Sequence, residues 1–204
     1  MSKTLKYILI GLGIILGLFS VGFVIINIMI ASAFGAFDKD YSVSDLKEEY
    51  NSKEKEIDDL ILYFNQIKPK DKIVSIEFKD DKTLSRLQID FKDSTKAIFQ
   101  QWDIPVNNLL NPKLVKDLDW NDEKIKLLKK KLDKADCISI EDGEPIKIGF
   151  KRIGMGMYSF NIFQDKATDI YNYNNSCQYI LVSKKLALEY GGGAIGTQCF
   201  QNLK

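Results

Sequence analysis

The longest stretch without a charged residue runs from Tyr7 to Phe37, between Lys6 and Asp38. A helix needs roughly 20 apolar residues to cross the hydrocarbon core of a bilayer, and this stretch exceeds that length. We therefore predict a cytoplasmic tail over residues 1–6 and a transmembrane anchor over residues 7–33. The lipid bilayer is the first partner that the sequence predicts.

A cleaved secretory signal is the alternative for the same stretch. Ala31-Ser32-Ala33 has the small-residue pattern of a cleavage site. The apolar region of a signal peptide covers only about 7–15 residues, whereas this one continues from Tyr7 to Ile30. The length favours a retained single-pass anchor over a cleaved signal.

The position of the basic residues predicts the orientation. Lys3 and Lys6 precede the apolar stretch, and basic residues remain on the cytoplasmic side of a membrane. The amino terminus is therefore expected inside and the bulk of the chain outside. The lysine- and asparagine-rich composition, which includes no histidine, suggests a bacterial inner-membrane protein of the cell envelope.

The charge balance argues against nucleic acid as a partner. The whole chain has 29 basic and 28 acidic residues, and two of the basic ones are Lys3 and Lys6. The part beyond the apolar stretch is therefore nearly neutral. Nucleic-acid-binding proteins usually have a clear basic excess or a basic stripe.

The segment after Asp40 has the spacing of an amphipathic helix, and we predict a juxtamembrane helix over residues 42–68. Ser42 and Asp45 fit a capping box, and Pro69 ends the helix. We expect its later half, residues 57–67, to lie on a sheet. A dimeric coiled coil fits the same apolar positions, and Gly13 and Gly17 also permit close helix contact, so a weak homodimer remains an alternative.

Alternating apolar residues predict strands in the rest of the chain. They occur in the following stretches: KIVSIEFK, LSRLQIDF, KAIFQQW, CISIEDGEPIKIGF, MYSFNIF and QYILVSKKLALEY. NDEKIKLLKKKLDKAD is a second helix, and the stretch from Asp103 to Trp120 is expected to be mainly a loop. The fold class is α+β: residues 71–204 form a globular domain with a mostly antiparallel sheet and one or two packed helices.

Two turns can be placed in this sheet. Asp142-Gly143 is a strong two-residue hairpin signal. Glu141, Asp142 and Glu144 surround it, and we expect them to be solvated turn residues. A second turn is predicted at Lys184-Lys185.

The chain ends with a literal G-x-G-x-x-G at Gly191, Gly193 and Gly196. A dinucleotide loop needs a following helix and an acidic residue about 20 positions later, but only eight residues follow Gly196. We therefore expect no cofactor there and interpret the glycines as a bend. The bend would let Thr197 to Phe200 pack back on the sheet.

A weaker hypothesis places a ligand-binding cleft between two glycine-rich bends. Its candidate residues are Gly154, Gly156, Glu189 and Gly191. Glu189 could serve as a buried base or a ligand contact. We favour the simpler interpretation that Glu189 is the outward residue of an alternating strand.

Three cysteines follow the apolar stretch, namely Cys137, Cys177 and Cys199. A disulfide is permitted outside the cytoplasm, and three pairings are open. We favour Cys177–Cys199, because the chain between them resembles a hairpin that returns on itself. The alternative is three small buried apolar residues.

No residue pattern identifies a catalytic or metal site. The absence of histidine excludes Ser-His and Cys-His pairs and histidine-based zinc sites. We expect an extracytoplasmic binding module that contacts another envelope protein, not an enzyme. Two alternatives remain: an envelope hydrolase that uses carboxylates such as Glu189 or Glu144, and a membrane-tethered inhibitor or immunity-like protein.

Overall fold

The computed structural model describes residues 2–92, 97–107, 118–165, 170–174, 177–192, 196 and 198–200. It divides into two compact units. The first contains residues 1–40 together with residues 153–155, and the second contains residues 41–152 and 156–204.

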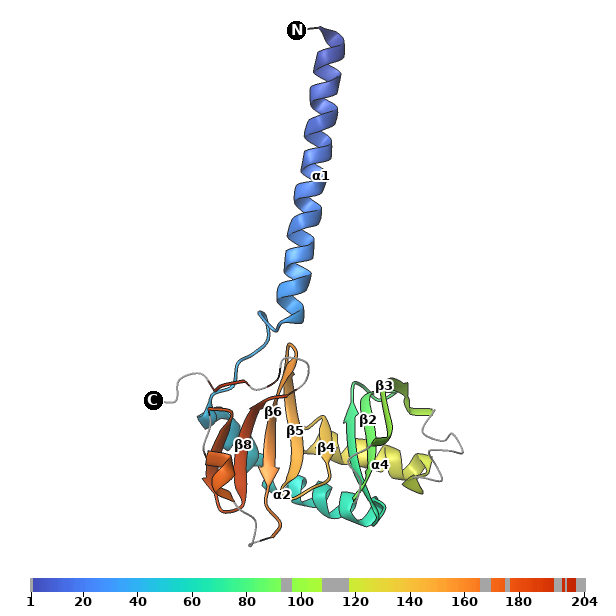
Figure 1. Cartoon of the computed structure of the whole chain (residues 1–204), viewed down its shortest axis with the longest axis vertical. Coiled ribbons are helices and arrows are strands. Elements are labelled where there is room, and N and C mark those ends of the chain that lie inside the picture. The colour runs from blue at the N-terminus through green and yellow to red at the C-terminus, as the bar shows by residue number, and fades with distance from the viewer. Residues whose placement is uncertain are drawn as a thin grey trace. The chain divides into compact units, whose positions relative to one another are not determined.

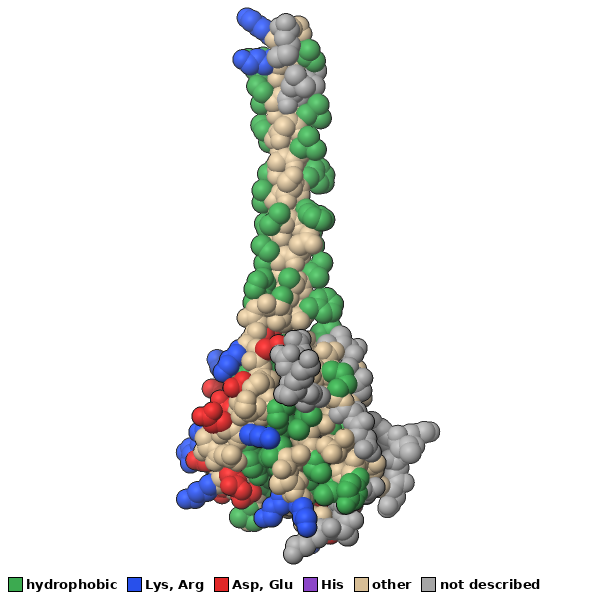
Figure 2. Space-filling model, turned by 90° about the vertical axis from the view of Figure 1, so that its left-hand side faces the viewer, with side chains coloured by type: hydrophobic (Ala, Val, Ile, Leu, Met, Phe, Trp, Pro, Cys, Tyr) green, Lys and Arg blue, Asp and Glu red, His purple; other side chains and the backbone are tan. Residues whose placement is uncertain are grey.

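Helix α1 (Lys3–Ala33) makes up most of the first unit (Figure 1). It begins at Ser2, whose hydroxyl accepts a hydrogen bond from the Leu5 amide. Its large apolar side chains are exposed all along the helix, and basic ones occur only in its first turns (Figure 2). With a mean hydropathy of 2.7 in its most apolar window, α1 is long and apolar enough to cross a membrane.

The second unit has α+β architecture, which confirms the predicted class. In chain order its elements are α2 (Val43–Ile67), β1 (Lys72–Phe78), β2 (Thr83–Phe91), β3 (Ala97–Pro105), α4 (Asp122–Lys134), β4 (Ser139–Glu141), β5 (Ile146–Ile153), β6 (Gly156–Ile162), the 3₁₀ helix η2 (Ile170–Asn174), β7 (Tyr179–Ser183) and β8 (Leu186–Gly191).

The eight strands form one sheet in the order β3-β2-β1-β4-β5-β6-β8-β7. The pairs β1–β2, β2–β3, β1–β4, β4–β5, β6–β8 and β7–β8 are all antiparallel. The connection through α4 brings β4 beside β1, so the two halves of the sheet join in the middle. This agrees with the predicted antiparallel sheet.

One face of the sheet carries the hydrophobic core. Ile76 lies opposite Leu87 on one side and Ile140 on the other, and Ile140 lies opposite Ile148. All four side chains are fully buried. Helices α2 and α4 lie on this face (Figure 1). Each fully buried aliphatic side chain contributes roughly 1.5–3 kcal/mol by leaving water.

The later half of helix α2 is buried, as expected, and its first half is packed as well. Leu46 and Tyr50 in the first half are buried as well as Ile57 and Phe64 in the second. The Tyr50 ring lies 5.5 Å from the Phe160 ring on β6. The helix starts with the predicted capping box between Ser42 and Asp45.

Helix α4 has a narrower buried stripe. Ile125, Leu128 and Leu132 are buried, and the side chain of Asn121 caps the first turn by accepting from the Lys124 amide. The Tyr63 hydroxyl of α2 donates to the Lys124 carbonyl, so the two helices are also joined by a polar contact. This helix was correctly predicted.

Two connections differ from expectation. Strand β3 continues through Asp103 to Pro105, because Ile104 pairs with Leu84 and is buried. The connection between β4 and β5 is not a two-residue turn but covers residues 142–145. Asp142 is buried there, donates its amide to the Val74 carbonyl and forms an ion pair with Lys68. The predicted turn at Lys184-Lys185 is confirmed.

The two tryptophans offer a test of the core. Trp120 is 2% exposed and donates its indole N–H to the Ile67 carbonyl at the end of α2, with 2.8 Å between nitrogen and oxygen. We expect Trp120→Ala to lower the free energy of unfolding by about 3–5 kcal/mol, since it leaves a large cavity. Trp102→Ala is the matched control and should cost about 1 kcal/mol or less, because Trp102 is exposed. Urea denaturation measures both, and equal losses would contradict this packing.

Candidate functional site

The sheet face opposite α2 and α4 carries mainly polar side chains, which strand pairing arranges in rows. Directly opposed residues share a face, so Trp102, Arg86, Glu77 and Ser139 form a row across β3, β2, β1 and β4. The neighbouring row consists of Gln100, Gln88, Ser75, Glu141 and Lys147. We call this surface the polar face.

Trp102 is the largest exposed side chain of the polar face. It lies on β3, the end strand of the sheet, and 53% of it is exposed. The Arg86 guanidinium lies over its ring, 5.3 Å from the ring centre. This cation–π contact holds a large planar surface in place. Tryptophan and arginine are the residue types most enriched at the energetic centres of protein interfaces.

Arg86 also begins a polar chain along β2. Its guanidinium donates to the Gln88 side chain, and the Gln88 amide donates to Asp90 at 2.7 Å. The Arg86 Nε and one Asp90 carboxylate oxygen are buried without a partner among the described residues. Such atoms usually bind water or a ligand, because a buried polar group without a partner costs roughly 1–3 kcal/mol.

An ion pair between β5 and β1 lies next to Arg86, because Glu77 is directly opposite it. Arg152 binds Glu77 through two parallel hydrogen bonds, Nε to Oε1 at 2.5 Å and Nη2 to Oε2 at 2.6 Å. Glu77 is buried, and its hydrogen bonds raise the pKa of Arg152. The paired geometry fixes both side chains.

Glu189 lies in the other half of the sheet, on the face away from the core as the alternation predicts, but it is not exposed to solvent. It is 3% exposed and bound by three side chains: Lys147 at 2.7 Å, Asn161 at 3.0 Å and Gln178 at 3.3 Å. Both carboxylate oxygens therefore have donors. The alternation of β8 does turn Glu189 away from Leu188, but neighbouring polar groups cover it. Ser159, directly opposite Glu189, is also buried, and its hydroxyl has no partner among the described residues.

Two tyrosines adjoin this polar cluster. The rings of Tyr173 on η2 and Tyr179 on β7 meet edge to face at 5.0 Å. Burial, then the Glu189 charge, raises the pKa of Tyr179 to about 12. Burial also raises the pKa of Tyr173. Both phenols therefore stay neutral at physiological pH, and the ring contact joins η2 to strand β7 of the sheet.

Gly154 belongs to the first unit, where it contacts the chain that follows α1. Its amide donates to the Asp38 carboxylate at 2.8 Å. Gly154 and Gly35 have φ angles of +52° and +80°, a region that favours glycine. A Cβ on Gly154 would lie 2.4 Å from the Phe34 carbonyl carbon, so this close backbone approach requires glycine.

The other cleft candidates lie on the sheet. Gly156 begins β6, and Gly191 ends β8 opposite Met157. Gly192 donates its amide to the Gly196 carbonyl at 2.9 Å, which forms a bend, while Gly193 lies outside the described residues. Among the described residues, cavities occur on the surface of α1 and beside α4, away from these glycines. The cleft therefore stays a prediction.

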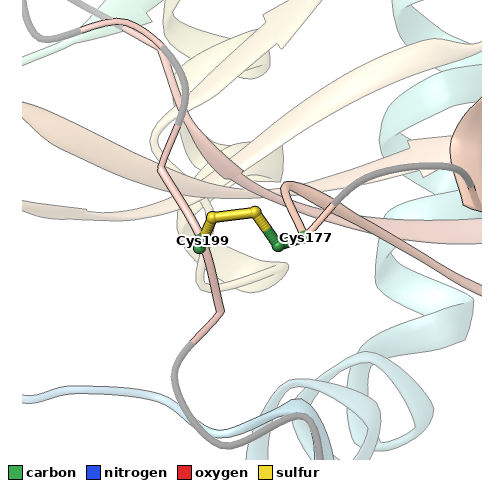
Figure 3. The surroundings of a disulfide bond; sticks show 2 residues. All are labelled: Cys177 and Cys199. Carbon is green, nitrogen blue, oxygen red and sulfur yellow. A yellow bond between two sulfur atoms is a disulfide. The ribbon is translucent and has the colours of Figure 1, made fainter.

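The structure joins Cys177 to Cys199 by a disulfide (Figure 3). Cys137 is free and buried, and burial raises the pKa of its thiol to about 12. Phe200, the residue after Cys199, is 5% exposed and packs on the sheet as predicted. Thr197 lies outside the described residues.

The acidic turn residues have structural partners. Asp142 is paired with Lys68, which corrects the expectation that it is solvated. Both carboxylate oxygens of Glu144 accept a hydrogen bond from the backbone N–H of Gln164, at 3.0 and 3.2 Å. Within the described ranges, no cluster of three or more acidic or cysteine side chains is placed to hold a metal ion.

Comparisons with known proteins give no further assignment. No protein family, no curated protein and no solved structure matches the chain significantly. Any function must therefore be argued from the residues themselves.

Sequence reasoning identified Glu189 but not its surroundings. Lys147 and Asn161 come from other strands, so no local spacing indicates them. Arg86 and Trp102 were also missed. The available signal was Trp102, a large aromatic residue two positions after Gln100 on the polar side of β3; Arg86 follows the ordinary polar alternation of β2 and gave no signal.

The pairing of Glu189 with Lys147 can be tested by a double-mutant cycle. Glu189→Gln keeps the shape but removes the charge, and we expect the free energy of unfolding to fall by about 1–3 kcal/mol. Lys147→Met should cost a similar amount. The double variant should lose clearly less than the sum, because the two charges support each other. Strictly additive losses in urea denaturation would contradict a coupled pair.

Proposed function

We propose that this protein is a single-pass membrane protein whose domain lies outside the cytoplasm and binds another protein. Helix α1 carries the proposal. It extends for 31 residues, and its large apolar side chains are exposed. Burial in lipid would remove this surface from water, at roughly 25 cal/mol per Å² of apolar area.

Two observations support the placement of the domain outside the cytoplasm. Lys3 and Lys6 precede the apolar stretch, which favours a cytoplasmic amino terminus. The Cys177–Cys199 disulfide requires an oxidising compartment, such as the outer side of a bacterial inner membrane.

The polar face supports protein binding as the activity. Trp102 and Arg86 present a fixed aromatic and cationic pair at the end of the sheet. Around them, each row carries one charge of each sign, Arg86 and Glu77 in the first and Glu141 and Lys147 in the second. A mixture of both signs suits a specific partner with a complementary pattern better than a uniformly charged polymer.

The anchor is tested by membrane extraction at alkaline pH. We expect the full-length chain to stay in the membrane pellet. Phe19→Arg with Phe23→Arg should move it to the soluble fraction, because each charge opposes insertion by roughly 3 kcal/mol. The matched control, Phe19→Leu with Phe23→Leu, should stay in the pellet. A released wild-type form that begins at Phe34 would instead indicate a cleaved signal.

The binding surface is tested by photo-crosslinking in the cells that express the protein. A crosslinking amino acid in place of Trp102 should give one adduct of discrete mass, which Arg86→Lys retains and a charge reversal of the exposed Glu141, Glu141→Lys, weakens. The same amino acid at Tyr171, an aromatic residue on η2 that is more exposed than Trp102 and belongs to neither row, is the control. Equal adducts from both positions, or none from position 102, would contradict the proposed surface.

A further inference from the structure

Two exposed cysteines hold one buried aromatic side chain at the end of the described chain. Cys177 and Cys199 are both exposed to solvent, whereas the adjacent Phe200 is 5% exposed. Cys177 lies two residues before β7, so the disulfide ties segment 198–200 to the start of that strand (Figure 3). A soluble dithiol can therefore reach the bond without unfolding the sheet.

Phe200 packs against a stacked pair of tyrosines, and we call the surface that it covers the Tyr158–Tyr190 slot. Tyr158 on β6 and Tyr190 on β8 lie directly opposite each other, and their rings stack at 4.3 Å. The Phe200 ring lies 5.9 Å from each of them. Its backbone amide donates to the Cys177 carbonyl at 3.0 Å. Phe200 is thus held by two kinds of contact: its ring meets the two tyrosines, and its backbone N–H meets a carbonyl.

The disulfide helps to keep Phe200 in contact with Tyr158 and Tyr190, because it ties the neighbouring residue, Cys199, to Cys177. A tether raises the effective concentration of a segment at its site, and this gain disappears when the tether is cut. Once the bond is cut, the interactions left to hold Phe200 among the described residues are one backbone hydrogen bond to Cys177 and the ring contacts, which are too few to keep the segment in place. An exposed disulfide is also the kind that is most readily reduced and used for regulation.

The third cysteine does not interfere. Cys137 is 4% exposed, and the raised pKa of its thiol suppresses the reactive thiolate. Thiol–disulfide exchange in this domain therefore concerns Cys177 and Cys199 alone.

We propose that the Cys177–Cys199 disulfide is a redox latch, and that its reduction frees Phe200 and opens the Tyr158–Tyr190 slot to an aromatic side chain of a protein partner. One thiol of the dithiol attacks the sulfur of one cysteine, which forms a mixed disulfide and releases the other cysteine. The second thiol of the dithiol then displaces the cysteine held in the mixed disulfide. The dithiol is oxidised to a disulfide, and its two protons pass to the sulfurs of Cys177 and Cys199. The inference rests on the proposed function only in that this disulfide forms outside the cytoplasm.

The partner that fits this slot is an extended segment with one aromatic side chain. Phe200 itself defines this chemistry, since its ring meets the two tyrosines while its backbone N–H meets the Cys177 carbonyl. Stacked and tilted rings at these distances are favourable arrangements for aromatic pairs. In the oxidised protein, the chain's own Phe200 competes with such a segment.

The release step is tested by hydrogen exchange on the purified full-length protein in detergent micelles, with and without dithiothreitol. Reduction should speed exchange of the Phe200 amide at least tenfold, while amides of β6 and β8 remain protected. The variant Cys177→Ser with Cys199→Ser should behave like the reduced protein, and Cys137→Ser like the oxidised one. Unchanged exchange at Phe200, or loss of protection throughout β6 and β8, would overturn the latch.

The opened slot is tested with a fluorescent peptide that has the sequence of residues 197–204, with Ser in place of Cys199. It should bind the Cys177→Ser, Cys199→Ser protein at least tenfold more tightly than the oxidised wild type. The same peptide with Ala in place of Phe200 should lose this preference. Equal binding to both proteins, or binding to neither, would overturn the slot.

These measurements separate the inference from the proposed function. Both use purified protein, so they do not depend on the compartment or on the partner of the polar face. Release of α1 from membranes would contradict the anchor but leave the latch intact. Recovery of the protein from cells with three free thiols would contradict the latch while leaving the anchor intact.

Discussion

The alternation of side chains along antiparallel strands is the constraint on which the second unit depends. Because successive residues point to opposite faces, one face of the eight-stranded sheet can be apolar throughout while the other is polar. The row Leu87, Ile76, Ile140 and Ile148 lies under the helices, and the neighbouring residues of the same strands form the polar face. A shift of one residue in register would exchange the two faces, so the core also fixes the positions of the polar groups.

The polar face differs in its two halves. Around Trp102 and Arg86 it is open to solvent, whereas around Glu189 it is covered and its charges are paired. Buried ion pairs add little net stability, but removing one partner is costly. The Glu189 cluster therefore supports the part of the sheet next to η2, and the open half is the one for which we propose docking. Phe200 lies against Tyr158 and Tyr190 on the opposite, apolar face.

Most of the secondary structure could be predicted, because its signals are local. The capping box at Ser42, the stripe Ile125, Leu128 and Leu132, and the alternation in β1 and β2 all lie within one segment each. The errors occurred where a distant contact decided the outcome. Asp142 looks like a turn residue, but Lys68 and the Val74 carbonyl bind it in a longer connection. Asp103 looks like the start of a loop, but the pairing of Ile104 with Leu84 extends the strand.

The sequence by itself determined an apolar helix long enough for a membrane, an α+β domain and a chain without histidine chemistry, since these depend on composition and short spacing. Only the tertiary structure decided that β4 pairs with β1, that Lys147 and Asn161 bind Glu189, and that Arg86 stacks on Trp102. These contacts join residues that are remote in the chain. Strand order and register bring them together, and no local pattern encodes either.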